Sequence, residues 1–121
     1  MGFSLARLLH GLGLDNGPGA WEEISFPAAF TYAVVHWQID ASEALIAYLW
    51  AWCENQVMAA LKSVPLGQTA GQKMLLSLGE RLPAIAGAAA TLGEDALGNY
   101  APGLALLSAR HETQYSRIFR S

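Results

Sequence analysis

Side chains able to bind metal ions or act as nucleophiles are few and scattered along the 121-residue chain. His10, His36 and His111 are far apart, and none has a second ligand of the usual kind three or four residues away, where a helix would place it on the same face. Cys53 is the single cysteine and stands in an apolar run with no basic neighbour to activate its thiol. The sequence therefore predicts no metal site, no bound cofactor and no enzymatic activity.

A Pro/Gly turn with polar neighbours is the next candidate for chemistry. The segment from Gly67 to Lys73 has the glycines and lysine of a phosphate-binding loop, but no strand precedes it and no Lys-Ser/Thr pair ends it. Lys62 falls in the predicted last turn of a helix, where a cation complements the helix dipole. Gln68 and Gln72 can cap the helix that follows. A polar, solvent-exposed edge is the plain interpretation of these residues.

The composition indicates one domain that associates with other proteins. Hydrophobic residues make up 53% of the chain and charged residues only 14%, against roughly 25% charged in an average domain. We expect exposed apolar patches that a partner or a second copy covers. With a net charge of −3 the chain lacks the basic character of a nucleic-acid-binding protein.

The same composition bears on location. A lone cysteine excludes a disulfide framework and makes the cytosol the default. The longest apolar run, from Ala44 to Cys53, is too short to span a bilayer, which needs about 20 residues. We predict a cytoplasmic protein with no membrane partner.

Hydrophobic residues recur at helical spacing and no segment alternates as a strand does, so the sequence predicts an all-α fold. A helix over residues 41–63 opens with a capping box, Asp40 and Glu43, and is about 35 Å long. It is apolar on all sides between Ala44 and Cys53, which predicts a buried helix at the centre of a bundle. Its last turns are expected to point four side chains inward: Val57, Met58, Leu61 and Val64.

Shorter helices are expected on either side of this one. A first helix ends at Gly11 and Gly13, and Ser25 caps a second. After the turn, a capping box of Thr69 and Gln72 is expected to open a helix whose inward face consists of Met74, Leu75, Leu78 and Leu82. Proline at 83 kinks or restarts that helix, residues 93–101 form a loop, and proline at 102 begins the last helix.

The end of the chain, residues 108–121, mixes arginines, aromatics and polar groups. A chain end of this kind usually frays. Because Ile118 and Phe119 would gain nothing in water, docking on a partner protein is the physical interpretation.

Two of these motifs match a known family. The segment Lys62-Ser63-Val64-Pro65-Leu66-Gly67-Gln68 and the ending Ser-Ala-Arg-His-Glu-Thr-Gln-Tyr-Ser-Arg-Ile-Phe-Arg-Ser resemble the UreF family of urease accessory proteins. The resemblance extends over essentially the whole chain, but only to the C-terminal half of a usual member. It implies one helical domain, residues 1–121, with a partner-docking tail at 108–121.

The resemblance also implies a function. UreF proteins are all-α cytosolic scaffolds without enzymatic activity of their own. They form homodimers, bind the accessory protein UreD (also called UreH) and recruit the GTPase UreG. The assembly handles nickel and delivers it to apo-urease. The alternative is a truncated structural or dimerisation module that takes no part in maturation.

Roles for individual residues follow from the same resemblance. The lysine before the turn is associated with control of the GTPase step, and Lys62 occupies that place. Its neighbours in the predicted partner-binding and regulatory surface are Pro65, Gly67, Gln68 and Gln72. The predicted UreD-docking residues in the tail are Arg110, His111, Glu112, Gln114, Tyr115, Arg117, Phe119 and Arg120.

Overall fold

The computed structural model describes residues 2–14, 24–98, 101–111, 113 and 115. These residues form six α-helices and one 3₁₀ helix and contain no strand, which confirms the all-α prediction. The chain divides into two compact units, Met1–Leu49 and Trp50–Ser121, with the boundary inside the longest helix. The single domain over 1–121 stays a prediction. None of the helices in the described ranges is long and apolar enough to cross a membrane.

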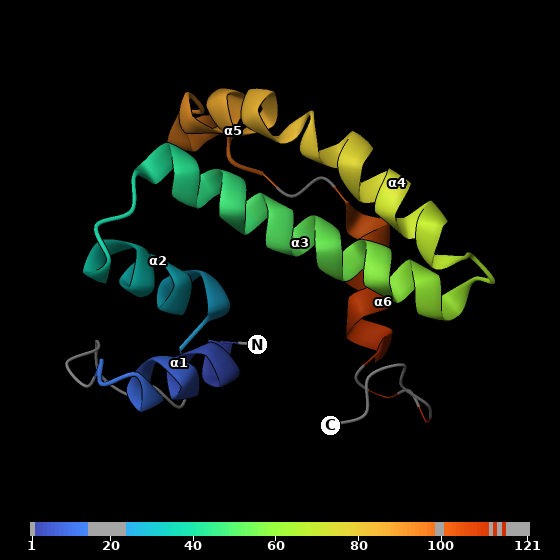
Figure 1. Ribbon diagram of the computed structural model, residues 1–121, viewed down its shortest axis with the longest axis horizontal. Coiled ribbons are helices and arrows are strands. Elements are labelled where there is room, and N and C mark those ends of the chain that lie inside the picture. The colour runs from blue at the N-terminus through green and yellow to red at the C-terminus, as the bar shows by residue number, and fades with distance from the viewer. Residues whose placement is uncertain (1, 15–23, 99–100, 112, 114, 116–121) are drawn as a thin grey trace. The chain divides into compact units, whose positions relative to one another are not determined.

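The first unit contains α1 (Gly2–Gly11), α2 (Phe26–His36) and the beginning of α3 (Ala41–Ser63). Helices α1 and α2 pack against each other (Figure 1). Their core is small: Leu9, Leu14 and Ala33 are buried, with Leu5 and Tyr32 packed around them. Gly2 permits the close approach, because a Cβ there would collide with the backbone at Ile24 and Phe26.

Both helices of this pair end in the same backbone motif. In α1 the N–H of Leu14 donates to the Leu9 carbonyl at 3.1 Å, and Gly13 takes the left-handed conformation with φ of 83°. In α2 the N–H of Ile39 donates to the Val34 carbonyl at 3.0 Å, and Gln38 takes the left-handed place with φ of 53°. Both helices therefore end in a Schellman motif, in which carbonyls of the last turn accept hydrogen bonds that they would otherwise lack. The glycine stop predicted for the first helix is confirmed.

Side-chain oxygens begin the next helices as predicted. The Ser25 hydroxyl accepts the Ala28 N–H at 3.4 Å at the start of α2. At the start of α3, Asp40 Oδ1 accepts the backbone N–H groups of Ser42 at 2.8 Å and Glu43 at 3.4 Å, and the Ser42 hydroxyl at 2.6 Å. The Ser42 hydroxyl, followed by the two backbone donors, lowers the pKa of the Asp40 carboxyl. Asp40 is therefore confirmed as the cap of the long helix.

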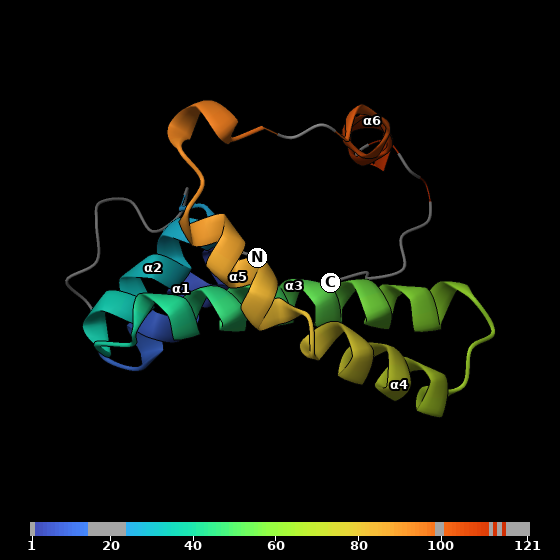
Figure 2. The ribbon, with the colours of Figure 1, turned by 90° about the horizontal axis from the view of Figure 1, so that it is seen from above.

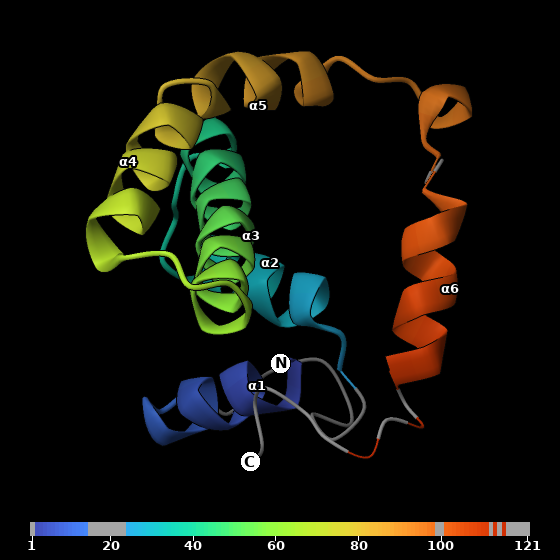
Figure 3. The same cartoon turned by 90° about the vertical axis from the view of Figure 1, so that its right-hand side faces the viewer.

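The second unit is organised around a hairpin of the end of α3 and α4 (Gln68–Gly79), which run side by side (Figure 1, Figure 2). A Cβ on Gly71 would lie 2.6 Å from Leu61 Cδ1, and a Cβ on Gly79 would lie 3.1 Å from the Trp50 ring. The contacts pair later residues of α4 with earlier residues of α3, so the two helices are antiparallel. Figure 3 views the same hairpin from the side of the turn.

The remaining elements of this unit are α5 (Leu82–Ala90), the 3₁₀ helix η2 (Glu94–Ala96) and α6 (Pro102–His111). Pro83 lies in the first turn of α5, so it restarts the helix. The capping box of Thr69 and Gln72 is wrong. Helix α4 begins at Gln68 with Gly67 as its cap and no side-chain cap bond, because the extended Gly67 backbone ends the turn before Thr69 is reached. The predicted loop over 93–101 includes η2.

The prediction that α3 is buried is not confirmed. Its length, 41–63, is as predicted, and Ala44, Cys53 and Val57 are buried. Trp50 and Trp52 are, however, 38% and 56% exposed. The reason is that each unit covers only part of the surface of α3. Three residues that were predicted to point inward are also substantially exposed: Met58 of α3, Val64 of the turn and Met74 of α4.

Candidate partner-binding surfaces

The α3–α4 turn is held by its own backbone. The Val64 N–H donates to the Ala60 carbonyl at 2.9 Å, and the Leu66 N–H donates to the Val64 carbonyl at 2.7 Å. The Gly67 carbonyl then accepts the N–H groups of Ala70 at 2.9 Å and Gly71 at 3.3 Å, which begins α4. The turn is therefore a defined backbone structure that presents the side chains on either side of it.

Those side chains are the predicted regulatory residues. Lys62 lies in the last turn of α3, as predicted for a cation that complements the helix dipole, and is exposed. Pro65 and Gly67 form the turn and are exposed, as are Gln68 and Gln72. The two glutamines stand four residues apart on α4 and so share one face. We call these five residues, Lys62, Pro65, Gly67, Gln68 and Gln72, the turn surface.

The second predicted surface begins on α6. Every side chain from 101 to 110 is exposed, including Arg110. Three leucines are more than half exposed: Leu104 at 58%, Leu106 at 64% and Leu107 at 65%. No side chain in residues 101–110 is buried, so this leucine-rich helix exposes apolar surface of the kind that a partner protein usually covers.

The rest of the predicted tail is described only in part. His111 is the last residue of α6, and its side chain lies outside the described residues. Tyr115 is fully exposed. Five predicted docking residues lie outside the described residues: Glu112, Gln114, Arg117, Phe119 and Arg120. Their role stays a prediction.

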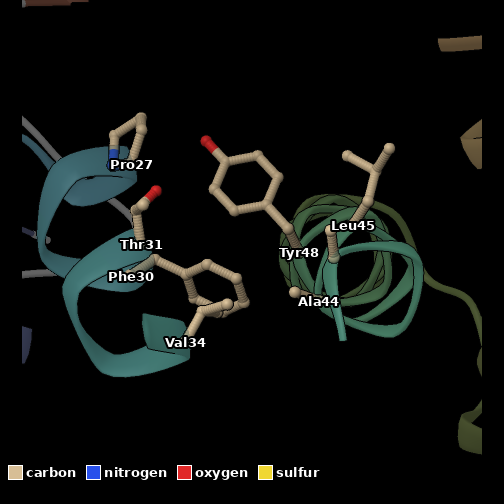
Figure 4. A pocket seen from close by; sticks show the side chains of 8 residues that line it. Pro27, Phe30, Thr31, Val34, Ala44, Leu45 and Tyr48 are labelled. Atoms are coloured by element: carbon tan, nitrogen blue, oxygen red, sulfur yellow. The ribbon is translucent and has the colours of Figure 1, made fainter. Parts of the chain in front are cut away.

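A third surface, which was not predicted from the sequence, is an apolar groove of about 340 Å³ in the first unit. One wall comes from α2 and consists of Pro27, Phe30, Thr31 and Val34. The other comes from the first turns of α3 and consists of Ala41, Ala44, Leu45 and Tyr48. Figure 4 shows Phe30 and Tyr48 pointing toward one another from the two helices.

Aromatic contacts shape this groove. The rings of Tyr48 and Phe30 meet edge to face with centroids 5.3 Å apart, and the ring of Phe26 lies tilted to that of Tyr48 with centroids 5.7 Å apart. Contacts of this geometry stabilise beyond the area they bury. A signal for the groove was present in the sequence, because the lining residues of each helix recur at positions i, i+3, i+4 and i+7, which lie on one helix face. These two helix faces form a groove only because α2 and α3 lie next to each other in the folded unit.

The described residues offer little for metal or covalent chemistry. No three of their His, Cys, Asp or Glu side chains gather where a metal ion would bind. Cys53 is a buried free thiol at 7% exposure, as predicted for a core cysteine. What the described surfaces present is apolar and polar area for binding.

Comparison with known proteins gives the class. The sequence model of the UreF family matches residues 1–79. Urease accessory protein UreF of Azoarcus sp. (strain BH72) is 52% identical over the whole chain, and those of Dechloromonas aromatica (strain RCB) and Methylobacillus flagellatus are 48% and 44% identical over the same extent. The chain belongs to the UreF family.

The alignments cover the whole of this chain but only part of each relative. The chain spans about half the length of the curated relatives, 55% of the Azoarcus protein and 56% of the other two. No solved structure matches the chain.

Proposed function

We propose that this chain is a non-enzymatic scaffold in urease maturation, which binds UreD (UreH), recruits and regulates the GTPase UreG, and so serves the delivery of nickel to apo-urease in the cytoplasm. Nickel is the cargo of the assembly and is bound by no residue assigned here. The observation that carries the proposal is identity of 44–52%, over the whole chain, to proteins named urease accessory protein UreF.

The exposed α6 supports the docking part of the proposal. A helix with Leu104, Leu106 and Leu107 all more than half exposed gains free energy when a partner covers it, at about 25 cal/mol per Å² of apolar surface. Arg110 at its end adds a charge that an acidic partner surface would select. We assign residues 108–121 as the UreD-docking tail, with α6 as its base.

The turn surface supports the regulatory part. Lys62 projects from a helix end, next to a turn whose backbone is fixed by hydrogen bonds. A cation held on a defined turn can be presented to a GTPase in one orientation. We assign Lys62 to control of the GTPase step and its neighbours on the turn surface to its placement.

Co-purification tests the docking role. Tagged UreD should capture the 121-residue chain and should fail to capture a chain that lacks residues 109–121. A matched control replaces the exposed acids Glu94 and Asp95 of η2 with alanine, which should leave capture unchanged. Equal capture of the full and shortened chains would remove the docking role from the tail.

Hydrolysis of GTP by the complex of this chain with UreD and UreG tests the role of Lys62. Lys62→Ala should change the hydrolysis rate several-fold with the complex intact by gel filtration. Lys73→Ala removes another exposed lysine, on α4, and should leave the rate unchanged. Identical rates for Lys62→Ala and the unaltered chain would leave Lys62 only the role of a cation that complements the dipole of α3.

The competing proposal is a helical module that folds or dimerises without serving maturation. The large exposed apolar area of α6 would then be buried between two copies. Gel filtration with circular dichroism distinguishes the two, because a pure dimerisation module would self-associate fully and would not be captured by UreD. We propose a homodimer as the state in which UreD is bound.

A further inference from the structure

One tryptophan stands exposed on α3 in line with Lys62. Trp52 is 56% exposed, whereas tryptophan is highly buried on average. Asn55, Ala59 and Lys62 follow it at intervals of three, four and three residues, so the four side chains lie along one side of the helix. We call these four residues the α3 ridge. From its first member to its last the helix rises about 15 Å.

The α3 ridge lies opposite the side by which α3 packs. Cys53 and Val57 are buried at 7% and 5% exposure, and Leu61 lies where a Cβ on Gly71 of α4 would collide with it. At about 100° of turn per residue, these three α3 residues point roughly 180° away from the ridge. Ala59 is half-buried and the rest of the ridge is exposed. The α3 ridge is therefore surface that the packing of the second unit leaves available.

The side chains of the α3 ridge define the kind of surface that fits it. The Trp52 indole has a large apolar face and one N–H donor, and tryptophan is enriched among the residues that dominate binding energy. Asn55 Nδ2 donates to the Ala51 carbonyl at 2.8 Å, which holds the amide against the helix, and Ala59 adds little bulk. Lys62 is the only charge on the ridge. A fitting partner has a slot for an indole and, about 15 Å away, a carboxylate.

Continuity with the turn surface identifies that partner. Lys62 belongs to both the α3 ridge and the turn surface, so a protein that reaches Lys62 lies beside the rest of the ridge. The inference rests on the proposed function, in which Lys62 controls the GTPase step. We propose that Trp52 anchors the GTPase UreG on α3 and so brings it to Lys62 in one orientation. Trp52 then supplies affinity, and Lys62 supplies regulation.

The experiment titrates UreG into the complex of this chain with UreD and measures binding by calorimetry. Trp52→Ala should weaken binding at least tenfold, because the indole fills the partner's slot. Trp52→Phe keeps an aromatic ring and should weaken binding less than Trp52→Ala does. Leu92→Ala is the matched control, since Leu92 follows α5 and is 53% exposed. It should leave binding unchanged.

A second pair of variants leaves the tryptophan in place. Asn55→Arg puts a bulky cation in the middle of the α3 ridge and should also weaken binding, whereas Ser77→Arg adds the same side chain at an exposed position of α4 and should not. Far-ultraviolet circular dichroism checks that each variant is folded. Loss of the helical signal in both ridge variants would make the ridge part of the core and overturn the proposal.

The rate of GTP hydrolysis separates an anchor from a regulator. With UreG at saturating concentration, the Trp52→Ala complex should hydrolyse GTP at the rate of the unaltered complex, whereas the Lys62→Ala complex should not. A Trp52→Ala rate that stays altered at saturation would place Trp52 in the regulatory step and overturn its role as an anchor.

The remaining outcomes distinguish this proposal from the proposed function. Binding of UreG that is equal for Trp52→Ala and Leu92→Ala would overturn the anchor alone. Absence of UreG binding by the unaltered complex would overturn the recruitment of UreG and the anchor with it. Self-association of the chain that Trp52→Ala abolishes and UreG does not compete with would make a second copy the occupant of the α3 ridge.

Discussion

Helices α4 and α6 belong to the same unit and have similar leucine-rich sequences, yet they are used in opposite ways. Helix α4 buries Gly71 and Leu75 and runs along α3. Helix α6 buries none of residues 102–110, although three of these are leucines. The number of leucines therefore does not decide which of the two helices packs.

Small residues account for the difference. Gly71 and Gly79 stand eight residues apart, a little over two turns, and both lie against side chains of α3. Without side chains, they leave room on α4 for Leu61 and the ring of Trp50, both of α3. The glycine of α6, Gly103, has no atom within 4 Å of the place where a Cβ would stand. Helix α4 is thus an element of the fold, and α6 is surface available to a partner.

Truncation of a leucine in each helix should give the largest contrast. Leu75→Ala removes a side chain that is 7% exposed, and we expect it to lower the free energy of unfolding by about 2–5 kcal/mol. Leu106→Ala removes one that is 64% exposed and should change it by less than about 0.5 kcal/mol. Urea denaturation followed by circular dichroism measures both. Equal losses would mean that α6 packs as α4 does.

Substitution of the glycines should give a smaller contrast. In Gly71→Val the new side chain must displace Leu61, so we expect a loss of about 1–3 kcal/mol. In Gly103→Val the side chain enters open space, and the change should be close to zero. Thermal melts of the two variants compare them directly. A neutral Gly71→Val would show that close approach is not what distinguishes α4.

Features with local causes could be predicted from the sequence, and features with tertiary causes could not. Both ends of α3 were predicted because local signals set them: the Asp40 carboxylate at one end, and Pro65 after the other. The burial of Trp50 and Trp52 was mispredicted, because it depends on which neighbours cover α3. The cap of α4 was misplaced because Thr69 fits a capping pattern, while the backbone of Gly67 decides where the turn ends.

The candidate surfaces divide in the same way. The place of Lys62 in the last turn of α3 followed from sequence alone, since helix ends are local. The groove did not, because neither lining helix face reveals which helix it will meet. The docking role of Arg110 and Tyr115 rests on family resemblance, and their exposure is the part that the structure adds.

The smallest expected effect concerns how α3 and α6 begin. Helix α3 starts at the Asp40 carboxylate, whereas α6 has no acid in its first turn. The Ser42 hydroxyl and the backbone N–H groups lower the pKa of Asp40 below its ordinary 3.8. The hydrogen-bonded Asp40 carboxylate therefore stabilises the folded state at pH values above its ordinary pKa. This stabilisation is lost as the pH falls through the lowered pKa.

Asp40→Asn should remove that pH dependence and keep a cap, because asparagine also accepts the N–H bonds. Below pH 4, amide hydrogen exchange should show Ser42 and Glu43 losing protection in the unaltered chain more steeply than in Asp40→Asn. Protection in α6 should be the same in both. Since the two proteins differ only at position 40, the difference between them isolates Asp40. If both proteins lost protection in parallel, the start of α3 would not depend on the charge of its cap. The starts of α3 and α6 would then not differ in this respect.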